Sequence, residues 1–408
     1  MRILISSQTY APDANGQAVF TTRLAEGLAN EKNEVEVLMP SYSWHAEKKT
    51  VNRVTLHYLP AFSLSPWYPE VRFILTSLRQ VSNVIKQFRP DIVHIQDHYS
   101  LSWLVQRAAH KQHIPVIGTN HFLPENILDN LPVPWVPMKF GTWVLWKSWR
   151  LVFDQLDLIT TPTPTAAQIL RDQLVKPAVI PISCGVDISR FQPRPDLDRK
   201  AWRRKFGLAP EKPLFIFVGR VDHEKRLDLL LEAMADLPDD ACQLVIVGKG
   251  LHLKPLQRLA MQLGLGDKVV FTGYLSADDL PMMLNSADVF VMPSEAELQS
   301  IATLEAMASG LPVLAADKCA LHELVKPGEN GYLFKAGERS SLAAAIRNII
   351  SRKSQWQAMG KVSQQIAGKH NFNKTTRAYQ EAYHQVLVAA PKVRARLRSK
   401  ISFNFPFD

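Results

Sequence analysis

The chain has 408 residues, 46% of them hydrophobic and 21% charged, a balance that excludes an intrinsically disordered protein. This length exceeds what one ordinary core holds, so we expect two domains of roughly 150–200 residues each. The net charge of +10 predicts an acidic partner, and nucleic acid, an anionic membrane surface and phosphorylated substrates all fit. Cys184, Cys242 and Cys319 lie far apart, which argues against a disulfide framework or structural zinc and favours buried thiols in a reducing compartment.

The N-terminal sequence predicts a cytoplasmic protein. Its first apolar run is too short for the core of a signal peptide, and no small-residue cleavage site follows. No stretch approaches the ~20 apolar residues that a membrane-spanning helix needs. Any membrane contact is therefore expected to be peripheral, on the cytoplasmic face.

Short apolar runs alternate with helical patterns through the first half. The runs, which we predict to be buried strands, are residues 2–6, 34–39, 91–95 and 115–118. Residues 17–29 and 101–111 have helical periodicity. Short strands alternating with helices predict a parallel sheet in an α/β domain.

A segment rich in Pro, Asp, Arg and Lys follows residue 190 and is typical of a linker. Strand-like runs then resume at residues 214–218, 243–247, 268–271, 288–292 and 312–315. The predicted organisation is a first Rossmann-like domain (1–190), a linker (191–212), a second such domain (213–370), a C-terminal helix returning to the first domain (371–390) and a basic tail (391–408). Two such sheets face a cleft, with ligands at the carboxyl ends of their strands.

One segment, residues 132–153, interrupts this pattern with four tryptophans and interspersed basic residues. The residues that we expect to contact a membrane or lipid acceptor are Trp135, Trp143, Trp146, Trp149 and Lys147. Tryptophan and lysine suit the headgroup zone of a bilayer, and the basic tail would add attraction to anionic lipid. The alternatives are an amphipathic helix packed on the core and a solvated tail.

The strand at 214–218 runs into Gly219 and a basic turn that contains Arg220 and Lys225. A following helix N-terminus would favour an anion at this place, so a phosphate or diphosphate is the natural ligand. The alternative is a solvated basic turn.

The strand at 288–292 leads to a helix for which Ser300 is a plausible N-cap. Glu297 precedes this helix and Glu305 lies in its second turn. Carboxylates beside a phosphate would repel it, so we expect these two to accept hydrogen bonds from hydroxyl groups, which sugars supply. The alternative is two exposed acids on a surface helix.

These elements together resemble the family-4 retaining glycosyltransferases of GT-B fold. The resemblance rests on Gly219-Arg220 with Lys225, and on Glu297-x7-Glu305 within residues 293–313 (PSEAELQSIATLEAMASGLPV). Residues 184–193 and the turn at 328–331 also match, so the resemblance covers nearly the whole chain.

The resemblance implies a role for each matched residue. Arg220 and Lys225 would bind the donor diphosphate, Glu305 the ribose hydroxyls, and Glu297 the sugar near its reacting carbon. Further donor contacts would come from backbone amides of Gln299, Ser300 and Ile301 and from the close approach that Gly16 allows. His121, in the segment 118–122 (GTNHF), matches the active-site histidine of the first domain; the alternative for a lone histidine is a satisfied core residue.

Two departures from the family pattern bear on specificity. Gln299-Ser300 stands where the family usually has Phe-Gly, and Gly16 stands alone where two glycines are frequent. Gln299-Ser300 with residues 120–126 (NHFLPEN) looks most like the branch that glycosylates diacylglycerol or related lipids.

The expected activity is retaining transfer of a hexose from a UDP- or GDP-sugar to an acceptor hydroxyl, with a membrane lipid favoured over a soluble or polysaccharide acceptor. No cofactor or metal is expected, since Arg220 and Lys225 supply positive charge and no acidic cluster has metal-ligand spacing. Two alternatives remain. One is an enzyme of this fold that rearranges or phosphorolyses sugars. The other is a non-catalytic basic protein that binds membrane or nucleic acid. Nucleic acid is disfavoured because no aromatic strand platform is evident.

Overall fold

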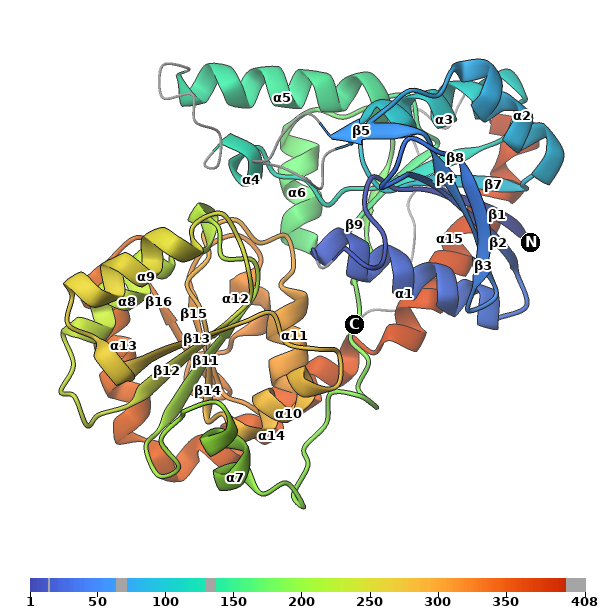
Figure 1. Ribbon diagram of the computed structural model, residues 1–408. Coiled ribbons are helices and arrows are strands. Elements are labelled where there is room, and N and C mark those ends of the chain that lie inside the picture. The colour runs from blue at the N-terminus through green and yellow to red at the C-terminus, as the bar shows by residue number, and fades with distance from the viewer. Residues whose placement is uncertain (14, 64–71, 129–136, 394–408) are drawn as a thin grey trace. The chain divides into compact units, whose positions relative to one another are not determined.

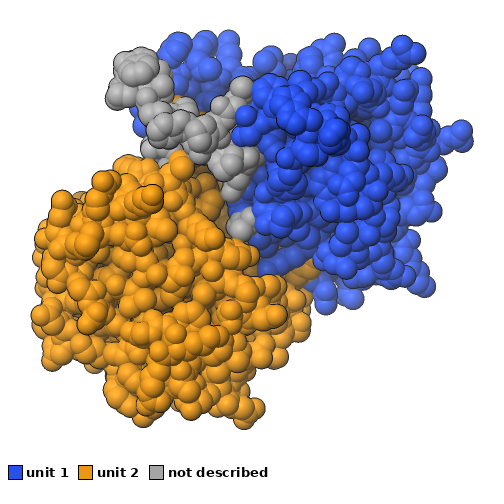
Figure 2. All heavy atoms as spheres, viewed as in Figure 1, with its two compact units in different colours: residues 1–124, 133–183, 373–408 blue, residues 125–132, 184–372 orange. Residues whose placement is uncertain are grey.

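The computed structural model describes residues 1–13, 15–63, 72–128 and 137–393. The chain forms two compact units (Figure 2). The first contains Met1–Pro124, Val133–Ser183 and Asn373–Asp408, and the second contains Glu125–Pro132 and Cys184–Phe372. The chain thus leaves the first unit after Ser183, some residues before the predicted boundary at 190, and returns to it at Asn373.

The first unit is built on a sheet of eight described strands in the order β10-β9-β8-β7-β1-β2-β4-β3. Its strand pairs are parallel except for the antiparallel pair β3–β4. The strands are β1 (Arg2–Ser6), β2 (Glu34–Pro40), β3 (Glu47–Val51), β4 (Val54–Leu59), β7 (Ile92–Ile95), β8 (Val116–Thr119), β9 (Leu158–Thr161) and β10 (Val179–Pro181). A separate hairpin pairs β5 (Ala61–Ser63) with β6 (Arg72–Ile74). Strand order reverses at β1, which makes the carboxyl end of β1 a ligand position.

Helices cover both faces of this sheet (Figure 1). They are α1 (Gly16–Asn30), α2 (Leu78–Phe88), α3 (Ser100–Lys111), α5 (Met138–Phe153), α6 (Pro164–Asp172) and the C-terminal α15 (Phe372–Val393). Trp149 and Phe153 of α5 join α2 and α3 in one core cluster. Tyr379 and Tyr383 of α15 are fully buried within the same unit, so the C-terminal helix forms part of the first unit's interior.

The second unit has a parallel sheet of six described strands in the order β13-β12-β11-β14-β15-β16. The strands are β11 (Leu214–Val218), β12 (Gln243–Val247), β13 (Val269–Gly273), β14 (Val289–Met292), β15 (Val313–Ala316) and β16 (Gly331–Phe334). The helices and 3-10 turns are α4 (Glu125–Leu128), α7 (Arg199–Lys205), η1 (His223–Lys225), α8 (Leu227–Ala235), α9 (Leu253–Gln262), η2 (Gly266–Lys268), α10 (Asp279–Ser286), α11 (Ile301–Ala308), α12 (Leu321–Leu324), α13 (Arg339–Ser351), η3 (Lys353–Gln355) and α14 (Trp356–Lys369). Order reverses between β11 and β14, so the loops that carry the two predicted donor motifs leave adjacent strands.

The predicted α/β fold with two parallel-sheet domains is confirmed. Strands predicted at 2–6, 214–218 and 243–247 are observed with the same bounds. Their residues are almost entirely buried, because helices cover both faces of each sheet, and this produces the continuous apolar runs in the sequence.

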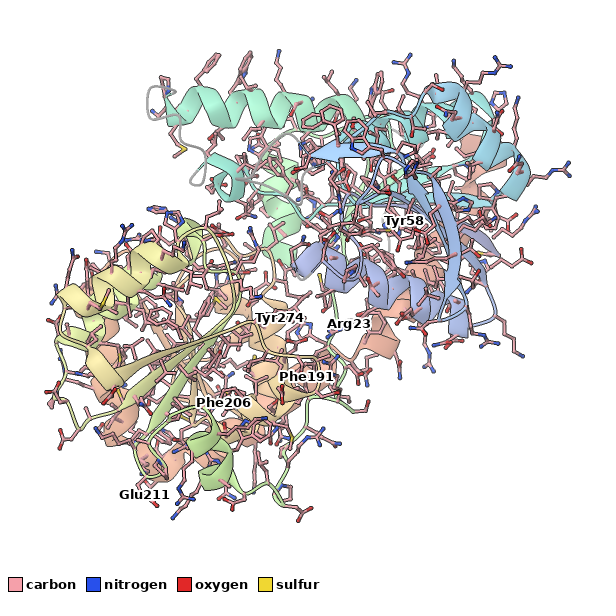
Figure 3. The ribbon with its side chains drawn as sticks, viewed as in Figure 1. Arg23, Tyr58, Phe191, Phe206, Glu211 and Tyr274 are labelled. Carbon is pink, nitrogen blue, oxygen red and sulfur yellow. The ribbon has the colours of Figure 1, made fainter. Side chains whose placement is uncertain are left out.

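The segment 191–212, predicted as a linker, instead contains α7 and belongs to the second unit. Asp198 caps the helix by accepting the Ala201 N–H at 3.0 Å. The Arg203 guanidinium is buried and donates to Asp288 Oδ2 at 2.8 Å. Figure 3 labels Phe206 and Glu211 at the C-terminal side of this helix. An ion pair with a buried guanidinium therefore fixes a segment whose composition is typical of a linker.

The segments that follow the crossing at Ser183 and precede the crossing at Asn373 are paired to each other inside the second unit. Val186 N–H donates to His370 O at 2.8 Å, and Phe372 N–H donates to Val186 O at 3.0 Å. Val186 and Asn371 form a parallel bridge. The outgoing and returning segments thus form one small ladder.

Candidate active site

Arg220 follows β11 and is held by two buried carboxylates. Its guanidinium donates to Asp222 Oδ2 at 2.5 Å and to Glu224 Oε1 at 2.8 Å. Asp222 and Glu224 are only 5% and 1% exposed, while the Arg220 side chain remains 30% exposed. The Arg220 guanidinium is therefore held in one orientation by two carboxylates rather than being merely solvated.

A second loop, which the sequence motifs did not indicate, supports this turn. Leu251 N–H donates to Asp222 Oδ1 at 3.0 Å, so Asp222 is held from both sides. Gly248 has φ +146°, and a Cβ on it would lie 1.8 Å from Gly219 O. A Cβ on Gly250 would lie 2.3 Å from Val221 O. In the sequence, Gly248 and Gly250 directly after the strand β12 indicate this close approach of the two loops.

Lys225 and Glu297 meet at the carboxyl ends of neighbouring strands. Lys225 Nζ donates to Glu297 Oε1 at 2.5 Å, and the two side chains are 13% and 10% exposed. The loop that carries Glu297 is anchored on the Lys225 loop, because Glu295 N–H donates to Glu224 O at 3.1 Å. The structure thus brings together two of the residues that the sequence singled out.

Helix α11 begins as predicted. Ser300 is its N-cap, and its hydroxyl accepts the Thr303 N–H at 3.2 Å. As whole residues, Glu305 is 6% exposed and Glu297 is 8% exposed. The alternative interpretation, two exposed acids on a surface helix, is therefore excluded. Buried carboxylates require hydrogen-bonding partners, and the N-terminus of α11 favours an anion.

The Gln299 side chain has a structural role at the chain connections. Its Oε1 accepts the Cys184 N–H at 2.7 Å, and its Nε2 lies 3.5 Å from His370 Nδ1. The predicted contribution of Gln299 was its backbone amide, which these side-chain contacts do not involve. The amides of Ser300 and Ile301 lie at the start of α11.

His121 lies in the first unit, just beyond β8. Its Nε2 is 3.0 Å from Gln96 Oε1, and its ring packs on Phe20 with centroids 5.0 Å apart. Burial lowers the pKa of His121 to about 3, so the ring is neutral at physiological pH. Gly16 is the first residue of α1, where the N-cap Asn15 accepts the Ala18 N–H at 2.9 Å. A Cβ on Gly16 would meet nothing within 4 Å, so packing does not require glycine there.

Helix α5 divides the predicted membrane residues between two faces. Trp146 and Trp149 are buried, at 8% and 0% exposure, and stack edge-on against each other. Their assignment to a membrane-contacting surface was wrong, because their spacing directs them to the core with Phe153. Trp143 is 53% exposed, with Lys147 Nζ 4.8 Å from its ring centroid. Trp135 and most of the basic tail lie outside the described residues.

In the described part of the chain, no cluster of three or more His, Cys, Asp or Glu side chains could hold a metal ion. Among the same residues, no helix has the length and apolar character to cross a bilayer.

Two family models match most of the chain. "Glycosyltransferase Family 4" matches residues 14–190, and "Glycosyl transferases group 1" matches residues 198–365. The sulfoquinovosyl transferase SQD2 of Arabidopsis thaliana is 29% identical over 78% of this chain, which spans 61% of that protein's length. The alpha-monoglucosyldiacylglycerol synthase of Streptococcus pneumoniae is 26% identical, with 86% of this chain and 79% of that protein aligned. Anabaena HepE, solved with UDP-glucose, is similar in structure with TM-score 0.74, 18% identity and coverage of 94% and 100%.

The two parallel-sheet units and these matches define a glycosyltransferase of GT-B fold. The first half of the chain matches the Family 4 model and the second half the group 1 model, in agreement with the resemblance of its motifs.

Proposed function

We propose that this protein is a retaining hexosyltransferase that moves a hexose from a nucleoside diphosphate sugar to a hydroxyl of a membrane lipid such as diacylglycerol. The observation that carries the proposal is the Lys225–Glu297 pair, 2.5 Å apart, beside Arg220 at the carboxyl ends of β11 and β14. Cationic side chains suited to a diphosphate lie next to a carboxylate suited to sugar hydroxyls, which supports a nucleotide-sugar donor.

In this proposal the second unit binds the donor. Arg220, Lys225 and the N-terminus of α11 receive the diphosphate, Glu305 accepts hydrogen bonds from the ribose, and Glu297 faces the sugar. The bond between the anomeric carbon and the diphosphate oxygen breaks, and its electrons remain on the diphosphate. The acceptor oxygen bonds to the anomeric carbon on the same face, and its proton passes to the departing phosphate oxygen. Fixed positive charges stabilise the leaving group as its charge develops.

Metal independence is part of the proposal. The two cationic side chains lie on one short turn, and buried carboxylates orient Arg220 through bonds of 2.5 and 2.8 Å. Such pre-positioned charge performs the role that Mg²⁺ has in other diphosphate chemistry. Turnover that survives EDTA supports this assignment, whereas turnover that requires added Mg²⁺ or Mn²⁺ contradicts it.

A lipid acceptor is supported by the surface of α5 and by the relatives. Phe140 and Trp143 are 58% and 53% exposed, next to the exposed Lys139 and Lys147. Aromatic and lysine side chains together favour the bilayer interface. One relative is named for diacylglycerol glycosylation, and HepE was solved with UDP-glucose. We therefore propose peripheral binding to an anionic cytoplasmic membrane surface, with UDP-hexoses as the first donors to test and GDP-hexoses as the alternative.

The test is a nucleotide-release screen. UDP- and GDP-hexoses are each presented with vesicles that contain diacylglycerol, with vesicles that lack it, and with soluble saccharides. We expect release that requires one donor and diacylglycerol, and a product whose anomeric configuration matches the donor by NMR. Release with soluble saccharides alone would support the alternative acceptor class, and no release with any donor would contradict the proposed reaction.

A further inference from the structure

A line of buried polar side chains runs behind His121 in the first unit. Gln96 Oε1 lies 3.0 Å from His121 Nε2, and Gln96 Nε2 lies 3.1 Å from His94 Nε2. His94 Nδ1 lies 2.8 Å from the Tyr383 hydroxyl. Gln96, His94 and Tyr383 are fully buried. The line therefore connects the end of β7 to the C-terminal helix α15 without contact with water.

With the Gln96 amide oriented as in the structure, the chemistry of these groups gives the direction of each bond. The Gln96 carbonyl oxygen only accepts, so His121 Nε2 must donate to it. The Gln96 amide nitrogen only donates, so His94 Nε2 is an acceptor. The Thr119 hydroxyl, 2.7 Å from the same nitrogen, is then a second donor to it. His94 is then protonated on Nδ1 and donates to Tyr383 Oη.

This sequence of bonds selects one tautomer of His121. With the proton on Nε2, the lone pair of the neutral ring is on Nδ1. Burial lowers the pKa of both His94 and His121 to about 3, which keeps both rings neutral. A reversed Gln96 amide would require the proton of His94 on Nε2 and that of His121 on Nδ1, so the orientation of Gln96 and the tautomers of the two histidines are coupled.

We propose that Gln96 is a positioning residue for His121, and that Tyr383 of the C-terminal helix holds Gln96 in place through His94. The inference rests on the proposed function, with His121 as the active-site histidine that the family resemblance implies. The C-terminal helix would then take part in sugar transfer through Tyr383, although Tyr383 is not proposed to contact the substrate.

The first experiment reads the tautomer without any turnover. The protein contains 12 histidines, and ¹⁵N labelling of their rings with assignment through His121→Asn gives the His121 signals. We expect the Nε2–H form in the wild type and a mixture of tautomers in Gln96→Leu. An Nδ1–H form in the wild type, or an unchanged signal in Gln96→Leu, would overturn the inference while leaving the proposed function intact.

The second experiment is a double-mutant cycle on sugar transfer. Gln96→Leu should lower kcat about tenfold or more and change KM for the donor little, since orientation of His121 is lost but donor contacts in the second unit remain. In a His121→Ala background the same substitution should change kcat less than twofold, because Gln96 acts through His121. Equal losses in both backgrounds would overturn the inference, whereas a His121→Ala enzyme as active as the wild type would contradict an active-site role for His121.

Tyr383→Phe offers a milder change with a matched control. It removes the acceptor for His94 Nδ1 and should lower kcat. Thr375→Val removes another buried hydroxyl on the same helix, one that donates to Ser183 O at 2.9 Å and is not part of the line from Tyr383 to Gln96. Matching losses in the two folded variants would show that the effect is one of helix packing and would overturn the role of Tyr383.

Discussion

Lys225 and Glu297 are 72 residues apart in sequence, yet their side chains form a 2.5 Å hydrogen bond. Each is proposed to contact a different part of the donor, Lys225 the diphosphate and Glu297 the sugar. Donor binding then involves an exchange of partners, in which Lys225 leaves the carboxylate for the phosphate and Glu297 accepts sugar hydroxyls instead. The pair would keep both side chains ordered before the donor arrives.

Glu297→Gln should therefore separate nucleotide binding from transfer. The variant removes the competing negative charge, so we expect UDP or GDP to bind as tightly as before or more tightly. Transfer should fall about 10- to 100-fold, since a charged hydrogen bond contributes about 1.5–3 kcal/mol. Lys225→Ala should instead weaken nucleotide binding by a similar factor. Calorimetry with the nucleoside diphosphate and kcat from nucleotide release measure the two effects.

Lys318→Ala is a matched control for Lys225→Ala. Lys318 is a half-exposed lysine that pairs with Glu295 at 3.4 Å in the same unit. An exposed pair of this kind contributes little, so nucleotide affinity should stay within about twofold. Equal losses in the two lysine variants, or unchanged transfer in Glu297→Gln, would contradict the proposed donor site.

The exposed face of α5 should bind anionic vesicles. A Phe140→Ala/Trp143→Ala variant should bind vesicles about tenfold or more weakly, since each buried aromatic side chain contributes about 1.5–3 kcal/mol. Binding should also weaken with salt, because Lys139 and Lys147 contribute electrostatically. Sedimentation with phosphatidylglycerol vesicles at two salt concentrations measures both effects.

Tyr274→Ala provides the comparison, because Tyr274 is 56% exposed but belongs to the second unit (Figure 3). We expect this variant to bind as the wild type does. Sedimentation of the α5 variant at wild-type levels would show that the membrane contact, if present, lies elsewhere.

The stability of the segment after residue 190 should depend on one side chain. Arg203 donates to Ser286 O at 2.8 Å, to Lys212 O at 2.9 Å and to Asp288 Oδ2 at 2.8 Å. Arg203→Ala removes these hydrogen bonds but leaves Arg199 as a partner of the partly buried Asp288 carboxylate, so we expect a loss of about 1–3 kcal/mol. The neighbouring Arg204 is exposed, so Arg204→Ala should change the free energy of unfolding by less than about 0.5 kcal/mol. Urea unfolding of both variants decides whether α7 is structural, and equal stability would restore the linker interpretation.

Arg203 also illustrates what the sequence could not reveal. Its partner Asp288 is 85 residues away in the sequence. The local composition, which is typical of a linker, therefore could not predict this ion pair. The same holds for Gln299, whose acceptor oxygen serves Cys184, 115 residues away. Periodicity and composition describe local sequence, so they cannot predict side-chain partners that the tertiary fold brings together.

Other features were predictable because their signal is local. β1 and β11 are buried on both faces, so continuous apolar runs mark them. The N-cap at Ser300 follows from its side chain and the helix after it. For α5 the helical spacing of Trp146, Trp149 and Phe153 marks the buried face, in agreement with the alternative of an amphipathic helix packed on the core.

Acid should destabilise the first unit. Burial lowers the pKa of His94, His98 and His121 to about 3, 4 and 3, against about 6.5 in the unfolded chain. Below pH 6.5 the unfolded state therefore binds protons that the folded state does not, so the free energy of unfolding falls as pH falls. Each histidine contributes a slope of about 1.4 kcal/mol per pH unit down to its folded pKa.

His98→Phe isolates one of these contributions. The His98 ring stacks on Tyr99 and packs on Phe122 with centroids 4.9 and 4.7 Å away, so phenylalanine can replace it without a change of charge in the folded state at neutral pH. Urea unfolding at pH 7.5, 6.5 and 5.5 should show a slope smaller by about 1.4 kcal/mol per pH unit below pH 6.5. His45→Gln, at an exposed position, should leave the slope unchanged. Because carboxylates titrate equally in wild type and variant, an unchanged slope in His98→Phe would mean that His98 is protonated in the folded protein, contrary to its burial.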